Sequence, residues 1–104
     1  MDFELIKCKD APSYFNRRDT FVVDLRQPEQ YREYHLPGAH NFPYENLAEW
    51  ENRLPGRQLI LFYCEHGNLS LMAAKRISRK GYRVAALIGG VECFLSVHTF
   101  SKYD

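Results

Sequence analysis

The stretch QLILFYCEHGNLS, residues 58–70, decides the fold class that this sequence predicts. Residues 59–63 are apolar at both alternating positions, which is typical of a strand that is covered on both faces, as in a parallel sheet. A loop with Gly67 follows, and residues 70–80 predict a helix that ends at Gly81. A buried strand that leads directly into a helix is the repeating unit of an α/β sheet.

Further strands and helices alternate on both sides of this stretch. Apolar and β-branched runs predict strands at residues 21–25 and 83–88, a short extended segment at 40–43 and an edge strand near residues 5–6. Helical spacing predicts helices at residues 12–16, 29–34, 44–54 and 91–102. We therefore expect residues 1–104 to form one α/β domain, with a mostly parallel five-stranded sheet and helices on both faces.

The composition excludes several classes of protein. The 104 residues are 45% apolar and 26% charged, which argues against disorder, and the net charge of +1 gives no field that attracts nucleic acid or anionic lipid. The longest apolar run, residues 59–64, is far shorter than the about 20 residues of a membrane span. Residues 1–10 carry charges where a signal peptide needs apolar residues. We expect a cytoplasmic protein that binds neither nucleic acid nor membranes.

The cysteines support the same expectation. Cys8, Cys64 and Cys93 are odd in number and contain no Cys-x-x-Cys pair, whereas a small secreted domain usually has an even disulfide framework. The sequence therefore predicts reduced, free thiols. Cys8 and Cys93 are expected to be packing residues, and an alternative role for Cys93 is that of a resolving thiol for Cys64.

Cys64 stands where α/β sheets place their ligands, directly after the carboxyl end of the predicted central strand. A turn from a strand into a helix directs several backbone N–H groups at one small volume, and this stabilises a thiolate. Gly67 permits the required backbone angles, Asn68 tolerates left-handed angles, and Ser70 suits the helix N-cap. Cys64 is therefore a candidate nucleophile.

The two residues that follow Cys64 have opposite effects on a negative charge at its sulfur. The carboxylate of Glu65 disfavours a second negative charge, and a protonated His66 would offset it. We therefore expect a milder activation of the cysteine than a cationic loop would give.

Two other interpretations of Cys64 remain open. It is a buried structural residue at the end of a strand, or it binds a metal ion together with His66, Cys93 and His98. The spacing of these residues matches no common zinc pattern, so we expect no metal site. His35, His40 and His98 are expected to be surface or hydrogen-bonded residues rather than catalysts.

Four separated segments of the sequence resemble a rhodanese (sulfurtransferase) domain. They are Val-Asp-Leu-Arg at residues 23–26 with the following Pro28-Glu29, HLPGAHNFP at residues 35–43, CEHGNLS at residues 64–70, and Gly81-Tyr82 through Gly89-Gly90. Together they span residues 20–94 in the order and spacing of that family. The resemblance implies a three-layer sandwich and a single-domain sulfurtransferase without a cofactor.

The resemblance also implies roles for particular residues. The Cys64 thiolate takes a sulfane sulfur from a small donor or from a protein persulfide, and passes it to a thiol, cyanide or another nucleophilic acceptor. Asp24 and Arg26 are expected to support the loops of the site. The terminal sulfur of the persulfide is expected to bind the backbone N–H groups of Glu65, His66, Gly67, Asn68, Leu69 and Ser70.

Some residues depart from the family's pattern. Glu65 and Leu69 stand where cationic residues often occur, so we expect weak activity with thiosulfate and better activity with a less charged donor, such as a glutathione persulfide or a protein persulfide. Tyr34 and Phe94 also differ from the pattern, and we interpret both as packing variations.

Two rival functions remain. A phosphatase or arsenate reductase of related fold needs an arginine six positions after the cysteine, where this chain has Ser70. The second rival is a non-catalytic module that docks a partner or senses redox state through Cys64. A basic run is either a docking site for an acidic partner or a solvated helix face, and it consists of Lys75, Arg76, Arg79, Lys80 and Arg83.

Overall fold

Five parallel strands form the centre of the protein in a computed structural model that describes residues 3–15 and 17–103, with side chains up to residue 98. The strands are β1 (Glu4–Ile6), β2 (Thr20–Asp24), β3 (His40–Asn41), β4 (Leu59–Tyr63) and β5 (Arg83–Leu87). Their order in the sheet is β1-β5-β4-β2-β3, and each neighbouring pair is parallel. The predicted α/β fold class is confirmed.

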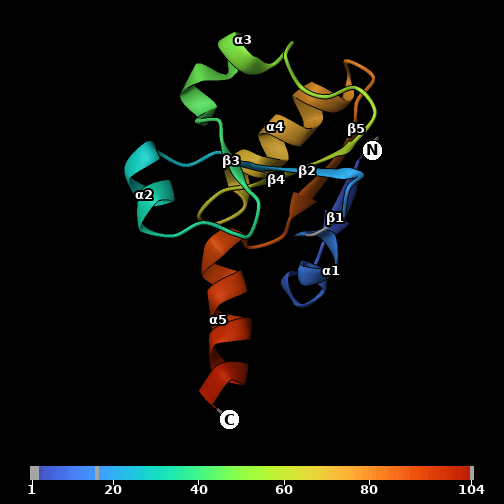
Figure 1. Ribbon diagram of the computed structural model, residues 1–104. Coiled ribbons are helices and arrows are strands. Elements are labelled where there is room, and N and C mark those ends of the chain that lie inside the picture. Colours follow the sequence, from blue (N-terminus) through green and yellow to red (C-terminus); the bar gives the residue numbers. More distant parts are fainter. Residues whose placement is uncertain (1–2, 16, 104) are drawn as a thin grey trace.

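Helices cover both faces of this sheet (Figure 1). They are α1 (Pro12–Phe15), α2 (Pro28–Glu33), α3 (Leu47–Trp50), α4 (Asn68–Ser78) and α5 (Gly90–Tyr103), with short 3-10 helices η1 (Cys8–Asp10) and η2 (Tyr44–Asn46). The core on one face joins the sheet to α1 and the start of α5, and the core on the other face joins it to α3 and α4. The molecule is thus a three-layer sandwich.

The central strand β4 explains why two cores form. Leu61 and Tyr63 point into the core beneath α1 and α5, whereas Ile60 and Phe62 point into the core beneath α3 and α4. All four side chains are completely buried. Because burial of such a side chain is worth roughly 1.5–3 kcal/mol, the sequence of β4 stabilises both layers at once.

Two predicted elements are shorter in the structure. The helix predicted at residues 44–54 is replaced by η2 and by the single turn of α3, which ends at Trp50. Asn52 disfavours a helix interior, and Pro55 disfavours helical angles at the residue before it. The extended segment predicted at 40–43 forms the two-residue strand β3, and one further backbone hydrogen bond runs from the N–H of Phe42 to the carbonyl oxygen of Asp24 at 2.9 Å. Pro43 ends the pairing because it has no N–H group to donate. Residue 16, within the predicted helix 12–16, lies outside the described residues.

The prediction of three free thiols is wrong for two of the cysteines. Cys8 and Cys93 form a disulfide, and only Cys64 is free. The sheet explains this pairing: β1 lies beside β5, so η1 and the start of α5, which follow these strands, come together on the same face. Cys93 is therefore bonded to Cys8 and is not available as a free resolving thiol for Cys64.

Neither a metal cluster nor a membrane span is found in the described part of the chain. No three of its His, Cys, Asp and Glu side chains come together in a group that would hold a metal ion. None of its helices has both the length and the apolar content needed to cross a membrane.

Candidate functional site

The loop between β4 and α4 wraps around the free cysteine. Cys64 follows β4 directly, and α4 begins at Asn68 with Gly67 as its N-cap residue. Gly67 has a positive φ of 106°, and a Cβ atom there would lie 2.9 Å from the backbone nitrogen of Gly89. Only glycine satisfies both conditions, so the curl of the loop depends on this residue.

The N-cap expected for α4 is wrong, and the left-handed angles that Asn68 tolerates are not used. Ser70 is not the N-cap: it lies inside α4, and its buried hydroxyl donates a hydrogen bond to the carbonyl oxygen of Gly67 at 2.9 Å. Asn68 does not adopt left-handed angles either, because Gly67 has already made the turn. The Ser70 side chain thus connects α4 to the loop residue Gly67.

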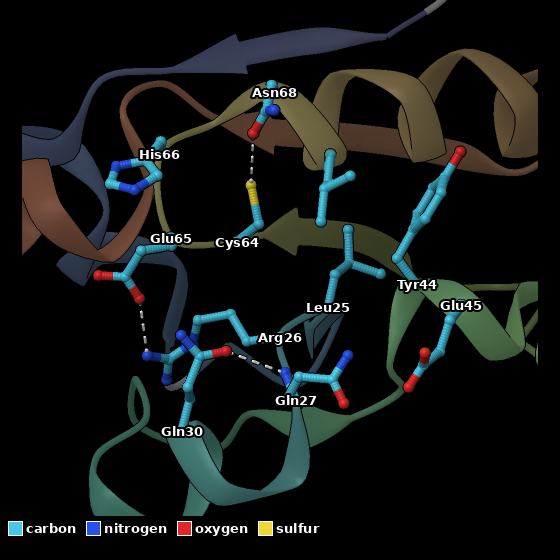
Figure 2. Close-up of a pocket in the computed structure, with 11 residues that line it drawn as sticks. Leu25, Arg26, Gln27, Gln30, Tyr44, Glu45, Cys64, Glu65, His66 and Asn68 are labelled. Carbon is cyan, nitrogen blue, oxygen red and sulfur yellow. Dashed lines mark hydrogen bonds and ion pairs between the residues drawn. The ribbon is translucent and has the colours of Figure 1, made fainter.

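A backbone N–H group and the start of α4 lie at the sulfur of Cys64. The N–H group of Gly67 donates a hydrogen bond to Sγ at 3.1 Å, and the side-chain oxygen of Asn68 lies 4.0 Å from Sγ (Figure 2). The first N–H groups of a helix have no intrahelical acceptor, and in α4 these begin at Asn68. The positive end of the dipole of this 11-residue helix therefore also lies at the sulfur. A sulfur that carries negative charge can thus accept hydrogen bonds at this place.

Cys64 lies at the base of an open cavity of about 340 Å³. The residue is only 1% exposed, so a reaction partner must reach into the cavity to touch the sulfur. The cavity is lined by Leu25, Arg26, Gln27, Gln30, Tyr44, Glu45, Cys64, Glu65, His66, Asn68 and Leu69. Of the loop residues singled out in the sequence, Glu65, His66, Asn68 and Leu69 line this cavity, whereas Gly67 and Ser70 do not.

Sequence analysis missed several lining residues. Gln27 and Gln30 follow β2, and Tyr44 and Glu45 follow β3. All four lie beyond the carboxyl ends of parallel strands, which is the signal that was available for finding them.

The carboxylate of Glu65 turns away from the sulfur. It forms an ion pair with Nη1 of Arg26 at 3.2 Å, and Figure 2 shows the Cys64 sulfur pointing in the opposite direction, toward Asn68. The guanidinium compensates the negative charge of Glu65. Glu65 therefore disfavours a thiolate less than the sequence alone suggests.

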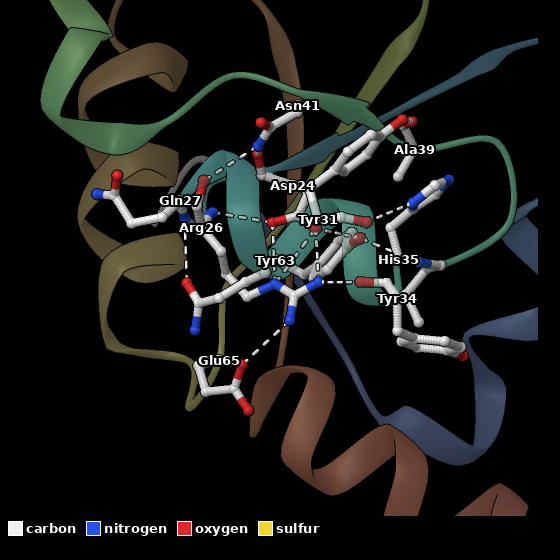
Figure 3. Close-up of polar contacts among 12 residues, drawn as sticks. Asp24, Arg26, Gln27, Tyr31, Tyr34, His35, Ala39, Asn41, Tyr63 and Glu65 are labelled. Carbon is white, nitrogen blue, oxygen red and sulfur yellow. Dashed lines mark hydrogen bonds and ion pairs between the residues drawn. The ribbon is translucent and has the colours of Figure 1, made fainter.

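A buried polar network holds Arg26 in place (Figure 3). The carboxylate of Asp24, which is fully buried, accepts hydrogen bonds from the backbone N–H of Arg26 at 2.8 Å, from Nη2 of Arg26 at 2.9 Å and from the hydroxyl of Tyr63 at 2.7 Å. Arg26 also donates to the carbonyl oxygen of Tyr34. Asp24 and Arg26 thus join the segment after β2 to the end of β4.

The protonation of this network follows from its burial. Burial lowers the pKa of the Arg26 guanidinium, but the hydrogen bonds and the charge of Asp24 outweigh this effect and raise the pKa above its usual value. Burial raises the pKa of the Tyr63 phenol well above its usual value, and the charge of Asp24 raises it further. Tyr63 therefore keeps its proton and donates it to Asp24 in a hydrogen bond.

The start of α5 supports the loop from behind. The N–H groups of Val91 and Glu92 donate to the carbonyl oxygens of Cys64 at 2.9 Å and Glu65 at 3.1 Å. A Cβ atom at Gly90 would lie 2.4 Å from the Cys64 carbonyl oxygen, so this close approach requires glycine. Two backbone hydrogen bonds thus connect the loop to a helix that is anchored by the Cys8–Cys93 disulfide.

Comparisons with known proteins agree with this geometry. Residues 8–96 match the family described as the rhodanese-like domain. A thiosulfate sulfurtransferase GlpE from Coxiella burnetii is 28% identical over 97% of this chain and 95% of its own length. A tRNA sulfurtransferase from Desulfurococcus amylolyticus is 32% identical over 70% of this chain, but this match spans 14% of that protein.

Solved structures give the same result. A rhodanese homolog from the bacterium Thermus thermophilus is 31% identical, with a TM-score of 0.69 over 86% of this chain and 99% of the other. A rhodanese-related protein from Thermoplasma volcanium is 22% identical, with a TM-score of 0.84 over 92% of this chain and 94% of the other, and it supports the fold.

Proposed function

Because this chain belongs to the family of rhodanese-like domains, we propose that it is a sulfurtransferase in which Cys64 carries the transferred sulfur as a persulfide. The observation that carries this proposal is the hydrogen bond from the Gly67 N–H group to the Cys64 sulfur at 3.1 Å, at the positive end of α4. The same donors suit the anionic terminal sulfur of a persulfide.

The reaction has two steps, and each step breaks one sulfur–sulfur bond and forms one new bond to the transferred sulfur. The Cys64 thiolate attacks the outer sulfur of a donor persulfide, R–S–SH. A bond forms between the two sulfur atoms, and R–S⁻ leaves with the electron pair of the broken bond. An acceptor thiolate or cyanide then attacks the outer sulfur of the Cys64 persulfide and releases the Cys64 thiolate.

The charges around the cavity point to a donor of low charge. Arg26 is the only Lys or Arg among its lining residues, and its guanidinium is already paired with Asp24 and Glu65. A second carboxylate, that of Glu45, also lines the cavity. A dianion such as thiosulfate meets no unpaired cation among these lining residues, so an organic persulfide is the better donor.

A second candidate function is a non-catalytic module that docks a partner or senses redox state. The observation that favours it is the 1% exposure of Cys64, because a docking surface needs no access to the sulfur. A phosphatase is less compatible with the loop, since the buried Ser70 hydroxyl bonds to Gly67 and no arginine occupies its position.

Mass spectrometry of the intact protein separates these functions. The protein is incubated with glutathione persulfide, and its mass is measured for the wild type and for Cys64→Ser. The sulfurtransferase gains one sulfur atom on Cys64, which cyanide removes, and Cys64→Ser gains none. A wild-type protein that gains no sulfur, or gains it equally in Cys64→Ser, contradicts the proposal and supports the non-catalytic module.

A further inference from the structure

A second hollow of about 380 Å³ lies next to the loop that carries Cys64. It shares His66 and Asn68 with the cavity that holds Cys64, so these loop residues lie between the hollow and the cavity. We call this hollow the lateral groove, and it is lined by Leu5, His66, Gly67, Asn68, Leu71, Ala86, Leu87, Ile88 and Gly89. None of the steps proposed above uses it.

The lateral groove is open because the helix layer ends before the edge of the sheet. It is apolar because mainly leucine, isoleucine and alanine side chains line it. Leu5 of β1 stands opposite Ala86 of β5, and Ala86 points into the core beneath α4. Leu5 thus faces the same side, but it is 46% exposed, as is Ile88, and Leu71 of α4 is 41% exposed. A contiguous exposed apolar surface of this kind is typical of an interaction site.

Positive charge flanks the groove on two sides. Lys75 lies one helical turn after Leu71, on the same face of α4. Lys7 follows Leu5 by two residues in extended backbone, with φ −75° and ψ 145°, so its side chain lies on the Leu5 side of the chain. Both lysines are exposed, and within the described residues neither has an acidic partner.

No acidic group near the groove is paired with Lys7 or Lys75 in the described residues. The Glu92 carboxylate lies 3.4 Å from His66 and is directed to the loop. Two other cations of the basic run, Arg76 of α4 and Lys80 just after it, are paired with Glu51. The lateral groove therefore complements a surface that has apolar side chains at its centre and carboxylates beside them.

A protein donor explains why such a groove adjoins the Cys64 cavity. The lining of the cavity offers a small donor no unpaired cation, and Cys64 is only 1% exposed. Binding energy from contacts remote from the reacting atoms is then needed to hold a donor in place. The lateral groove adjoins the cavity and can supply such contacts.

We propose that the lateral groove docks a protein that carries the donor sulfur on a cysteine of a projecting segment. Apolar side chains of that segment occupy the space between Leu5, Leu71 and Ile88, and its carboxylates pair with Lys7 and Lys75. This inference rests on the proposed sulfurtransferase function and adds the class of donor.

The test compares two donors by single-turnover loading of Cys64. One is glutathione persulfide, and the other is a synthetic peptide persulfide whose cysteine is flanked by leucine and glutamate residues. Leu71→Ser, Ile88→Ser and Lys75→Glu each lower kcat/KM for the peptide about tenfold and change it little for glutathione persulfide. Leu95→Ser and Arg57→Glu are matched controls because Leu95 lies on α5 and Arg57 precedes β4 at the far end of the sheet, and both leave the peptide reaction unchanged.

Each other outcome overturns the docking proposal. If the three variants react with the peptide as the wild type does, or lose activity equally with both donors, the groove does not bind the donor. The same holds if a peptide with lysines in place of glutamates reacts equally well. A dimer in light scattering that becomes a monomer in Leu71→Ser shows that a second copy fills the groove. If Cys64 gains no sulfur from either donor, the sulfurtransferase function itself fails.

Discussion

The carboxylate of Glu65 lies 3.2 Å from the guanidinium of Arg26, although the two residues are 39 positions apart. Arg26 is also bound to the buried carboxylate of Asp24, so one cation serves two anions. This arrangement partly offsets the negative charge of the loop residue next to the cysteine, and it leaves the guanidinium without an unpaired charge for a dianionic donor.

Replacement of Glu65 by glutamine is expected to raise kcat/KM for thiosulfate severalfold. The variant removes one negative charge from the cavity and leaves Arg26 with a single carboxylate partner. Sulfur transfer from thiosulfate to cyanide is the measurement. Glu33→Gln on α2, outside the cavity lining, is the matched control and should leave the rate unchanged. An equal rate in the wild type and Glu65→Gln contradicts this electrostatic explanation.

Replacement of Gly67 by alanine is expected to abolish loading of Cys64 with sulfur. The φ of 106° and the contact with Gly89 both exclude a Cβ atom, so the loop must change its path and the N–H group loses its direction toward the sulfur. Intact mass after incubation with a persulfide donor measures the loading. Gly56→Ala is the control, because a Cβ there meets no atom within 4 Å. Normal loading of Gly67→Ala refutes the role assigned to the loop amide.

Replacement of Tyr63 by phenylalanine is expected to lower the free energy of unfolding by about 1–3 kcal/mol. The hydroxyl donates to Asp24 at 2.7 Å and accepts from the N–H of Leu36 at 3.0 Å, so its removal leaves two buried groups with one partner fewer. Urea denaturation measures the change. Tyr82→Phe, at a half-buried position with no hydrogen bond from its hydroxyl in the described structure, should differ little from the wild type, and equal losses in both variants argue against the network.

The stability of the protein is expected to fall when its disulfide is reduced. Cys8 and Cys93 are 85 positions apart, and loss of a bond that closes such a long loop typically costs about 2–5 kcal/mol. Thermal unfolding with and without dithiothreitol measures this effect. Titration of the unreduced, denatured protein should find one free thiol, that of Cys64, and a count of three free thiols contradicts the disulfide.

Acid is expected to weaken the link between α3 and α4. Hydrogen bonds from Arg76 lower the pKa of Glu51 below its usual value of 4.5. A carboxylate whose pKa is lower in the folded state stabilises the protein above the unfolded pKa, and this contribution is lost as the pH falls through the folded pKa. The difference in stability between the wild type and Glu51→Gln should therefore be largest at neutral pH and shrink below about pH 4.5.

The exposed neighbour Glu49 provides the control for this pH dependence. Glu49→Gln removes a carboxylate for which no ion pair occurs in the described structure, so its difference from the wild type should not vary with pH in the same way. A pH-independent difference for Glu51→Gln shows that the ion pair with Arg76 does not stabilise the fold.

Local patterns in the sequence were enough to predict the fold class and the place of the loop. The uninterrupted apolar run of β4 requires two covered faces, and the step from this strand into α4 places Cys64 at the carboxyl end of a parallel sheet. Helix lengths were predicted less well, as the short α3 shows, because capping and turn formation near Pro55 outweigh a helical spacing of apolar residues.

The sequence by itself determined a parallel α/β sheet and one cysteine in a glycine-containing loop after its central strand, since both follow from residues that are neighbours in the chain. Only the tertiary structure decided that Glu65 pairs with Arg26, that Cys8 bonds to Cys93, and that an uncovered groove adjoins the loop. These features join residues that are far apart in sequence. Which partners meet depends on the order of the strands in the sheet and on the edge where the helix layer stops.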